Sequence, residues 1–110
     1  MNFAPVHIVD TANVAQADAR HYAEIIRDSL APVMRDAGAP MIALRTTSDA
    51  LGEDVLVQVV WNVEDHATWN RVRRNFFTDP RWHAVWAELA PLRTGGTRRF
   101  YYPLVEGAEA

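Results

Sequence analysis

The four histidines are the side chains of this sequence best suited to acid–base chemistry near neutral pH. They are His7, His21, His66 and His83. No two of them have a metal-binding spacing with a third ligand nearby, so we expect no protein-built metal site. His7 lies in a predicted strand, the most rigid part of the chain, and is our candidate for a catalytic general base. The alternative for His7 is a hydrogen-bonded histidine of the sheet.

A second group of residues is suited to holding a small molecule. Gln58 is polar in an otherwise apolar stretch that also contains Trp61. If buried, this glutamine needs a hydrogen-bond partner from a ligand or from a second subunit. Tyr22 combines an aromatic ring with a polar tip, beside His21 near the start of a predicted helix. We therefore take Tyr22, Gln58 and Trp61 as candidate substrate-binding residues.

The stretch "WNVEDHATWNRVRRNFFTDPRW", residues 61–82, adds Trp69 and Arg73 to these candidates. The guanidinium of Arg73 is a two-pronged donor suited to a carboxylate or a phosphate. Alternatively, Arg73 forms an ion pair with Glu64, with Asp65 or with an acid of a partner chain. Trp69 is a candidate for lining an aromatic ligand or capping the mouth of a pocket. The later tryptophans, at helical spacing, are expected to pack in the core.

Composition excludes several classes of chemistry. The sequence has no cysteine and no lysine, which excludes disulfides, thiolate catalysis and Schiff-base formation. Its net charge of −3 argues against nucleic-acid binding, which normally requires a basic excess. No apolar run approaches the ~20 residues of a membrane span, and the N-terminus does not resemble a signal peptide. We expect a single cytoplasmic domain over residues 1–110.

The elements that must position these residues follow from periodicity and turn chemistry. Runs of β-favouring residues bounded by turn residues predict four strands, at 5–11, 40–47, 55–63 and 97–105. Helical spacing of apolar residues predicts two helices, at 13–38 and 64–90. The resulting β-α-β-β-α-β order is that of the ferredoxin-like folds. We therefore predict an α+β domain with a four-stranded antiparallel sheet and both helices on one face.

Local signals refine the two helices. Asn13, followed by Gln16, resembles a capping box at the start of the first helix, and Gly38 is well placed to end it. Pro32 should kink this helix, because it lacks the N–H that would bond the carbonyl four residues earlier. Asp79 and Pro80 suit an N-cap and a first helical position, so we expect the second helix to break and restart there.

The stretch from residue 59 to residue 82 resembles the C-terminal half of the NIPSNAP family. The matching residues are Trp61, Glu64, Asp65, Arg73, Asp79, Pro80 and Trp82. Val59, Val63 and Trp69 depart from the family pattern. The resemblance implies a dimeric α+β barrel, in which two sheets face each other and the small-molecule site lies between the sheet and the helices of each subunit. Relatives of that architecture include cofactor-free monooxygenases, haem-degrading enzymes, isomerases and proteins without known activity.

The third strand independently favours a homodimer. Residues 55–63 are largely apolar on both sides, and one layer of helices can cover only one of them. A second copy of the sheet is the simplest cover for the other side. We expect the dimer to persist in solution and a stable folded monomer not to.

Three hypotheses for function follow. The first is binding or transformation of a small hydrophobic or aromatic metabolite, without a bound cofactor, in a pocket lined by Tyr22 and by His7 or Gln58. The second is a non-catalytic ligand-binding or interaction domain. The third is haem binding or degradation, for which His21 or His83 would have to face the cleft. Whether the protein is an enzyme is left open by the sequence.

Overall fold

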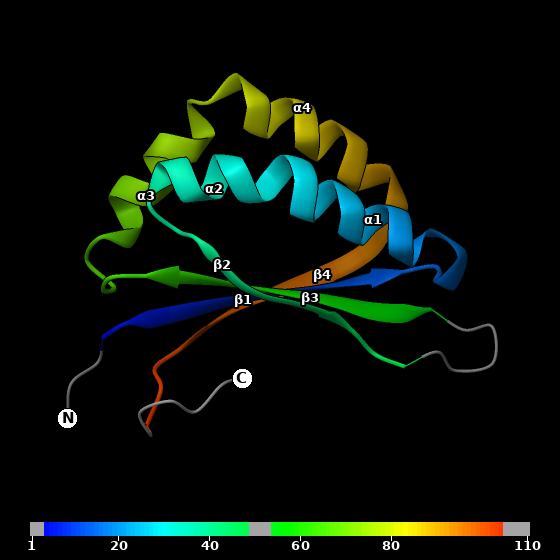
Figure 1. Cartoon of the computed structure of the whole chain (residues 1–110), viewed down its shortest axis with the longest axis horizontal. Coiled ribbons are helices and arrows are strands. Elements are labelled where there is room, and N and C mark those ends of the chain that lie inside the picture. The colour runs from blue at the N-terminus through cyan, green and yellow to red at the C-terminus, as the bar shows by residue number, and fades with distance from the viewer. Residues whose placement is uncertain (1–3, 49–53, 105–110) are drawn as a thin grey trace.

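The computed structural model describes residues 4–48 and 54–104, which form the α+β fold predicted from the sequence. Four antiparallel strands form one sheet in the order β2-β3-β1-β4. They are β1 (Val6–Val14), β2 (Met41–Thr46), β3 (Val55–Val63) and β4 (Arg93–Tyr101). All the helices lie over one face of this sheet (Figure 1). The ferredoxin-like prediction is confirmed.

The first helical segment is a continuous path with a π-helical turn in the middle. It consists of a 3-10 turn (Gln16–Asp18), α1 (Ala19–Ile25), the π-helical turn (Ile26–Leu30) and α2 (Ala31–Ala37). The π-helical turn lies just before Pro32, where the missing N–H of proline disrupts regular α-helical bonding. Gly38 ends α2 in the left-handed conformation, with φ of 109°, as its position predicted.

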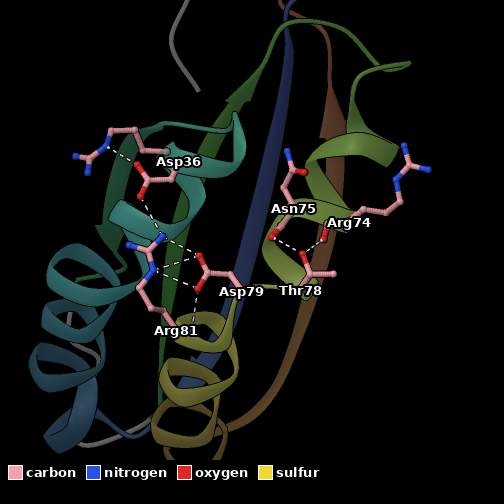
Figure 2. Close-up of polar contacts among 7 residues, drawn as sticks. Asp36, Arg74, Asn75, Thr78, Asp79 and Arg81 are labelled. Atoms are coloured by element: carbon pink, nitrogen blue, oxygen red, sulfur yellow. Dashed lines mark hydrogen bonds and ion pairs between the residues drawn. The ribbon is translucent and has the colours of Figure 1, made fainter.

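The second helical segment breaks and restarts where the sequence indicated. It consists of α3 (Trp69–Phe77), α4 (Pro80–Leu89) and a short 3-10 turn (Ala90–Leu92). The Asp79 side chain accepts a hydrogen bond of 2.9 Å from the backbone N–H of Arg81, which makes Asp79 the N-cap of α4. The Arg81 guanidinium also bonds Asp79 and reaches Asp36 of α2 at 3.0 Å (Figure 2). These contacts tie α2 to the start of α4.

Two strands extend beyond their predicted bounds, and β4 also ends earlier, at Tyr101; its predicted end, residue 105, lies outside the described residues. β1 continues to Val14, so Asn13 lies in the strand and the predicted capping box is wrong. β4 begins at Arg93 rather than at residue 97. Both extensions have one cause: Val14 pairs with Val55 of β3 and with Arg93 of β4. Ladder pairing on both sides outweighs the local turn preference of the asparagine and of the glycines in "RTGG".

The two faces of the sheet differ in what covers them. We call the face beneath the helices the inner face; it carries Val6, Ile8, Asp10, Ala12 and Val14 of β1. In β3 the inner residues are Val55, Val57, Val59, Trp61 and Val63, which are all buried. The opposite, outer face carries His7 and Thr11 of β1 beside Asn62 and Gln58 of β3. Figure 1 shows no helix over the outer face.

No helix in residues 4–48 and 54–104 is long and apolar enough to cross a lipid bilayer.

Candidate functional site

A cleft of about 370 Å³ lies between the inner face and the helices. Its floor comes from the sheet and consists of Asp10, Val59, Trp61, Gly96, Thr97 and Arg98. One wall comes from the first helical segment and consists of Tyr22, Ile26, Leu30 and Met34. The other wall comes from the second segment and consists of Phe77, Trp82, Trp86 and Leu89, with Arg93 at the start of β4. The volume and the largely apolar lining are typical of small-molecule sites.

An ion pair is built into the floor of the cleft. Arg98 donates two hydrogen bonds to the carboxylate of Asp10, at 2.7 and 2.9 Å. The indole N–H of Trp61 donates to the same carboxylate at 3.1 Å. This two-pronged pairing fixes both charged side chains and leaves them mutually neutralised. Arg98 also lies over the ring of Trp69, 5.2 Å from its centroid, which holds the guanidinium against the protein.

Arg93 occupies a different environment at the beginning of β4. Its guanidinium donates to the hydroxyl of Tyr22 at 3.3 Å and lies over the ring of Trp86, 5.2 Å from the centroid. The side chain also folds back over Gly96: a Cβ atom at position 96 would collide with the guanidinium and would lie 2.8 Å from the carbonyl oxygen of Thr11. Glycine at position 96 therefore leaves the space that Arg93 uses.

Tyr22 places a protonated hydroxyl in the cleft. The side chain is buried, with 2% of its surface exposed. Burial raises the pKa of the phenol above its ordinary value of 10.0, and the nearby Arg93 opposes this shift only in part. The hydroxyl therefore accepts the bond from Arg93 and keeps its own proton at neutral pH.

The helical wall on the α3–α4 side is a row of contacting aromatic rings. Phe77 and Trp82 lie 4.7 Å apart, and Trp82 stacks on Trp86 at 5.8 Å with an interplanar angle of 19°. A cation lies at each end of the row, since Arg73 is 6.0 Å from the Phe77 centroid and Arg93 lies on Trp86. Rings in this arrangement offer flat, polarisable surface to an aromatic ligand.

The residues predicted to bind substrate divide between the cleft and other places. Tyr22 and Trp61 line the cleft. Trp69 is buried beside it, packed against Phe76 at 5.9 Å and Phe100 at 5.5 Å. Arg73 is exposed on α3, outside the lining. Its predicted ion pair with Glu64 or Asp65 does not form.

Neither His7 nor Gln58 lines the cleft, so the prediction that one of them would is wrong. Both lie on the outer face, because strand residues alternate and the inner positions of their strands are taken by Ile8 and Val59. Gln58 instead accepts a hydrogen bond of 2.6 Å from Arg45 and donates one of 3.2 Å to Thr11.

The other histidines also lie outside the cleft. His21 and His66 are exposed, and His83 donates to the carbonyl oxygen of Phe77 at 2.7 Å. In the part of the chain that the structure describes, no histidine lines the cleft. The haem hypothesis required His21 or His83 to face it, and neither does. The described residues also contain no group of three His, Asp or Glu side chains that could hold a metal ion.

Three charged residues of the cleft were missed from the sequence: Asp10, Arg93 and Arg98. The position of Asp10 could have been predicted, because in a strand it lies two and four residues after Ile8 and Val6 and therefore on the same face. Arg93 fell in a stretch that we predicted to be a loop. Arg98 was placed in a strand, but its partner across the sheet depends on a register that the sequence does not specify.

A second hollow, of about 540 Å³, lies between α1 and the edge strand β2. Its lining includes Arg20, Glu24 and Arg27 from α1 and Leu44 and Arg45 from β2. It contains no aromatic side chain, and Arg27 already pairs with its neighbour Asp28 at 2.7 Å. The aromatic cleft is therefore the better candidate for a ligand site, although the second hollow is larger.

Comparison with known proteins identifies the fold. No protein-family model matches the sequence, and no curated protein matches it. An uncharacterised NIPSNAP-like domain protein from Burkholderia xenovorans has a similar structure, with a TM-score of 0.78, 18% identity, and coverage of 98% of this chain and 92% of that one. A NIPSNAP family protein of unknown function from Agrobacterium tumefaciens matches with a TM-score of 0.76, 13% identity, and coverage of 94% and 91%.

A protein that is not described as a NIPSNAP protein has a similar structure. A putative antibiotic biosynthesis monooxygenase from Nitrosomonas europaea matches with a TM-score of 0.66, 8% identity, and coverage of 98% of both chains. Identities this low carry the fold and not the activity. The chain has the ferredoxin-like α+β fold of the NIPSNAP proteins.

Proposed function

We propose that this protein binds a small aromatic or hydrophobic metabolite in the cleft between its sheet and its helices, without a bound cofactor. The observation that carries the proposal is the row of contacting rings along one wall of the cleft, in which Phe77 is tilted against Trp82 and Trp82 stacks on Trp86. Large rings usually pack against a sheet and close the space beneath them. Here they border an open cavity, and a flat ligand would recover the ring contacts that the cavity leaves unmade.

Polar groups in the cleft are few and fixed in position, as expected for a site that orients its ligand. The hydroxyl of Tyr22 and the guanidinium of Arg93 lie together, and Asp10 is held by Trp61 and Arg98. The hydroxyl of Tyr22 is a hydrogen-bond donor, and the carboxylate of Asp10 is a hydrogen-bond acceptor. These groups support recognition, and a reaction in this cleft would have to use them rather than the predicted base His7.

The binding proposal can be tested by calorimetric titration with 2-naphthol, a neutral two-ring probe. Trp86→Ala removes one of the stacked rings and is expected to weaken binding by about tenfold, the effect of losing one good aromatic contact. Arg20→Ala, in the second hollow, is the matched control and should bind 2-naphthol as the wild type does. Binding that is lost in Arg20→Ala but retained in Trp86→Ala would contradict the proposal.

The proposed assembly is a homodimer formed through the outer face. No helix of residues 4–48 and 54–104 covers this face (Figure 1), and two large side chains on it, Leu56 and Tyr101, are 41% and 47% exposed. Val9 and Val60 lie between them on the same face and are already buried within one chain, at 5% and 1% exposed. A second copy of the same sheet would cover Leu56 and Tyr101 at once, by two-fold pairing.

Sedimentation velocity at low micromolar concentration measures the assembly directly. The wild type is expected to sediment as a dimer, and Leu56→Glu to lose the dimer, because a carboxylate would be buried without a partner in the interface. A wild-type species at 12.4 kDa would contradict the dimer. A monomeric wild type would not contradict the ligand proposal, because all the residues that line the described cleft come from one chain.

A further inference from the structure

Arg93 gives the cleft a positive charge that no described residue balances. The charged side chains of the lining are Asp10, Arg93 and Arg98. Asp10 and Arg98 neutralise each other through two short hydrogen bonds. Within residues 4–48 and 54–104, no carboxylate oxygen lies within 4.0 Å of the Arg93 guanidinium. The cleft therefore carries one uncompensated positive charge and favours a ligand with one negative charge.

The guanidinium of Arg93 is also held in one place. Trp86 supports one side of it, the Tyr22 hydroxyl accepts a bond from it, and the missing side chain of Gly96 leaves room for it above β4. A planar donor fixed in this way is prepared to pair with the two oxygens of a carboxylate. Tyr22 adds a further donor, because it accepts from Arg93 and still has its own O–H proton.

We propose that the ligand of the cleft is an aromatic acid, whose single carboxylate is bound by Arg93 and the Tyr22 hydroxyl while its ring lies against Trp82 and Trp86. This inference rests on the proposed function, since it assumes that the same cleft binds an aromatic molecule. It adds the charge of the ligand and the residue that recognises it. Arg98 has no part in binding the carboxylate, because Asp10 already occupies its guanidinium.

The test compares two probes of the same shape, 2-naphthoate and its neutral amide 2-naphthamide, by calorimetric titration at pH 7. The wild type is expected to bind the acid about tenfold more tightly than the amide, the effect of one charge-assisted hydrogen bond. Arg93→Gln should bring this preference below about threefold, because the acid loses its charged partner whereas the amide loses only a neutral acceptor's hydrogen bond. The amide serves as the control for folding, because a variant that still binds it has kept its cleft.

Two further variants separate the effect of Arg93 from a general effect of positive charge. Gly96→Ala keeps the arginine but fills the space of its guanidinium, so it should also reduce the preference for the acid. Arg99→Gln removes an exposed charge from the same strand, on the outer face, and should change neither affinity. A preference that disappears in Arg99→Gln would identify a general charge effect and overturn the inference.

The possible failures are distinguishable. Equal binding of the acid and the amide by the wild type would overturn the inference and leave the proposed function standing. A preference for the acid that survives in Arg93→Gln but disappears in Arg98→Gln would show that Arg98, and not Arg93, binds the carboxylate. That result would also overturn the inference. Tighter binding of 2-naphthyl phosphate than of 2-naphthoate would overturn the assignment to a carboxylate. Failure of both naphthalene probes and of 2-naphthol to bind would remove the proposed function itself.

Discussion

The two faces of the sheet each carry a row of hydrogen-bonded polar side chains, in different surroundings. On the inner face, Arg98 bonds Asp10 at 2.7 Å and Trp61 joins them. On the outer face, Arg45 bonds Gln58 at 2.6 Å, and Gln58 reaches Thr11 in the neighbouring strand. The bond lengths are alike, but the inner row forms the floor of a cavity with an aromatic wall, and no helix covers the outer row.

This comparison shows that bonded polar groups do not by themselves mark a ligand site. The inner row differs in its neighbours: it borders a cleft with an aromatic wall, although water still reaches the Arg98 side chain, which is 42% exposed. The outer row stays open in the described chain and suits a partner surface. The predictions below test this difference by changing one residue on each face.

The largest expected effect is the difference in the free energy of unfolding between Trp61→Ala and Leu56→Ala, two variants of the same strand. Trp61 is 1% exposed on the inner face, and its loss should lower the free energy of unfolding by about 3–5 kcal/mol. Leu56 is 41% exposed on the outer face, and its truncation should cost less than about 1 kcal/mol when the protein is dilute. Urea denaturation of the two variants measures both values. Equal losses would show that the two faces are buried to the same degree.

A smaller effect contrasts the two polar rows. Asp10→Asn removes the charge that holds Arg98, and we expect a loss of about 1 kcal/mol, since the Arg98 side chain is 42% exposed and water screens part of the interaction. Gln58→Ala on the outer face should cost less than about 0.5 kcal/mol. Urea denaturation again gives the values. A larger loss for Gln58→Ala than for Asp10→Asn would contradict the stronger role of the inner row.

The smallest expected effect is a pH dependence that belongs to the inner face. Because burial raises the pKa of Tyr22 above 10.0, the stability contributed by the neutral phenol is fully present below pH 10.0 and is lost as the pH rises through the folded-state pKa. The melting temperature should therefore fall in alkaline solution. Tyr22→Phe should reduce this fall, whereas Tyr101→Phe, on the outer face and 47% exposed, should not. The same fall in both variants would refute the assignment to Tyr22.

Most of the fold could be predicted because its signals are local. The Asp-Pro restart, Gly38 and the β-favouring run of residues 55–63 each depend on neighbouring residues, and the structure confirms all three. The ends of β1 and β4 could not be predicted in the same way. Residues 12–14 and 93–96 have turn-like sequences and become strands only because they pair with each other and, in β1, with β3.

The cleft was harder to predict than the fold, because it depends on which side of each strand meets the helices. Residues 55–63 are apolar on both sides, so the sequence does not show that Trp61 faces inward and Gln58 outward. The same ambiguity placed His7 in the pocket, although Ile8 occupies that face. Tyr22 was predicted to line the cleft because it lies on the apolar stripe of a helix, where the buried side is readable from spacing alone.

The most direct test of the central claim is to map the bound ligand on the two faces by nuclear magnetic resonance. Indole and backbone N–H signals are followed while 2-naphthol is added. We expect the indole signals of Trp61, Trp82 and Trp86 to shift with one common affinity, because all three line the cleft. The backbone signals of Arg45 and Leu56, on β2 and the outer face, should stay in place. Shifts centred on these two residues, with the three indoles unchanged, would contradict the account.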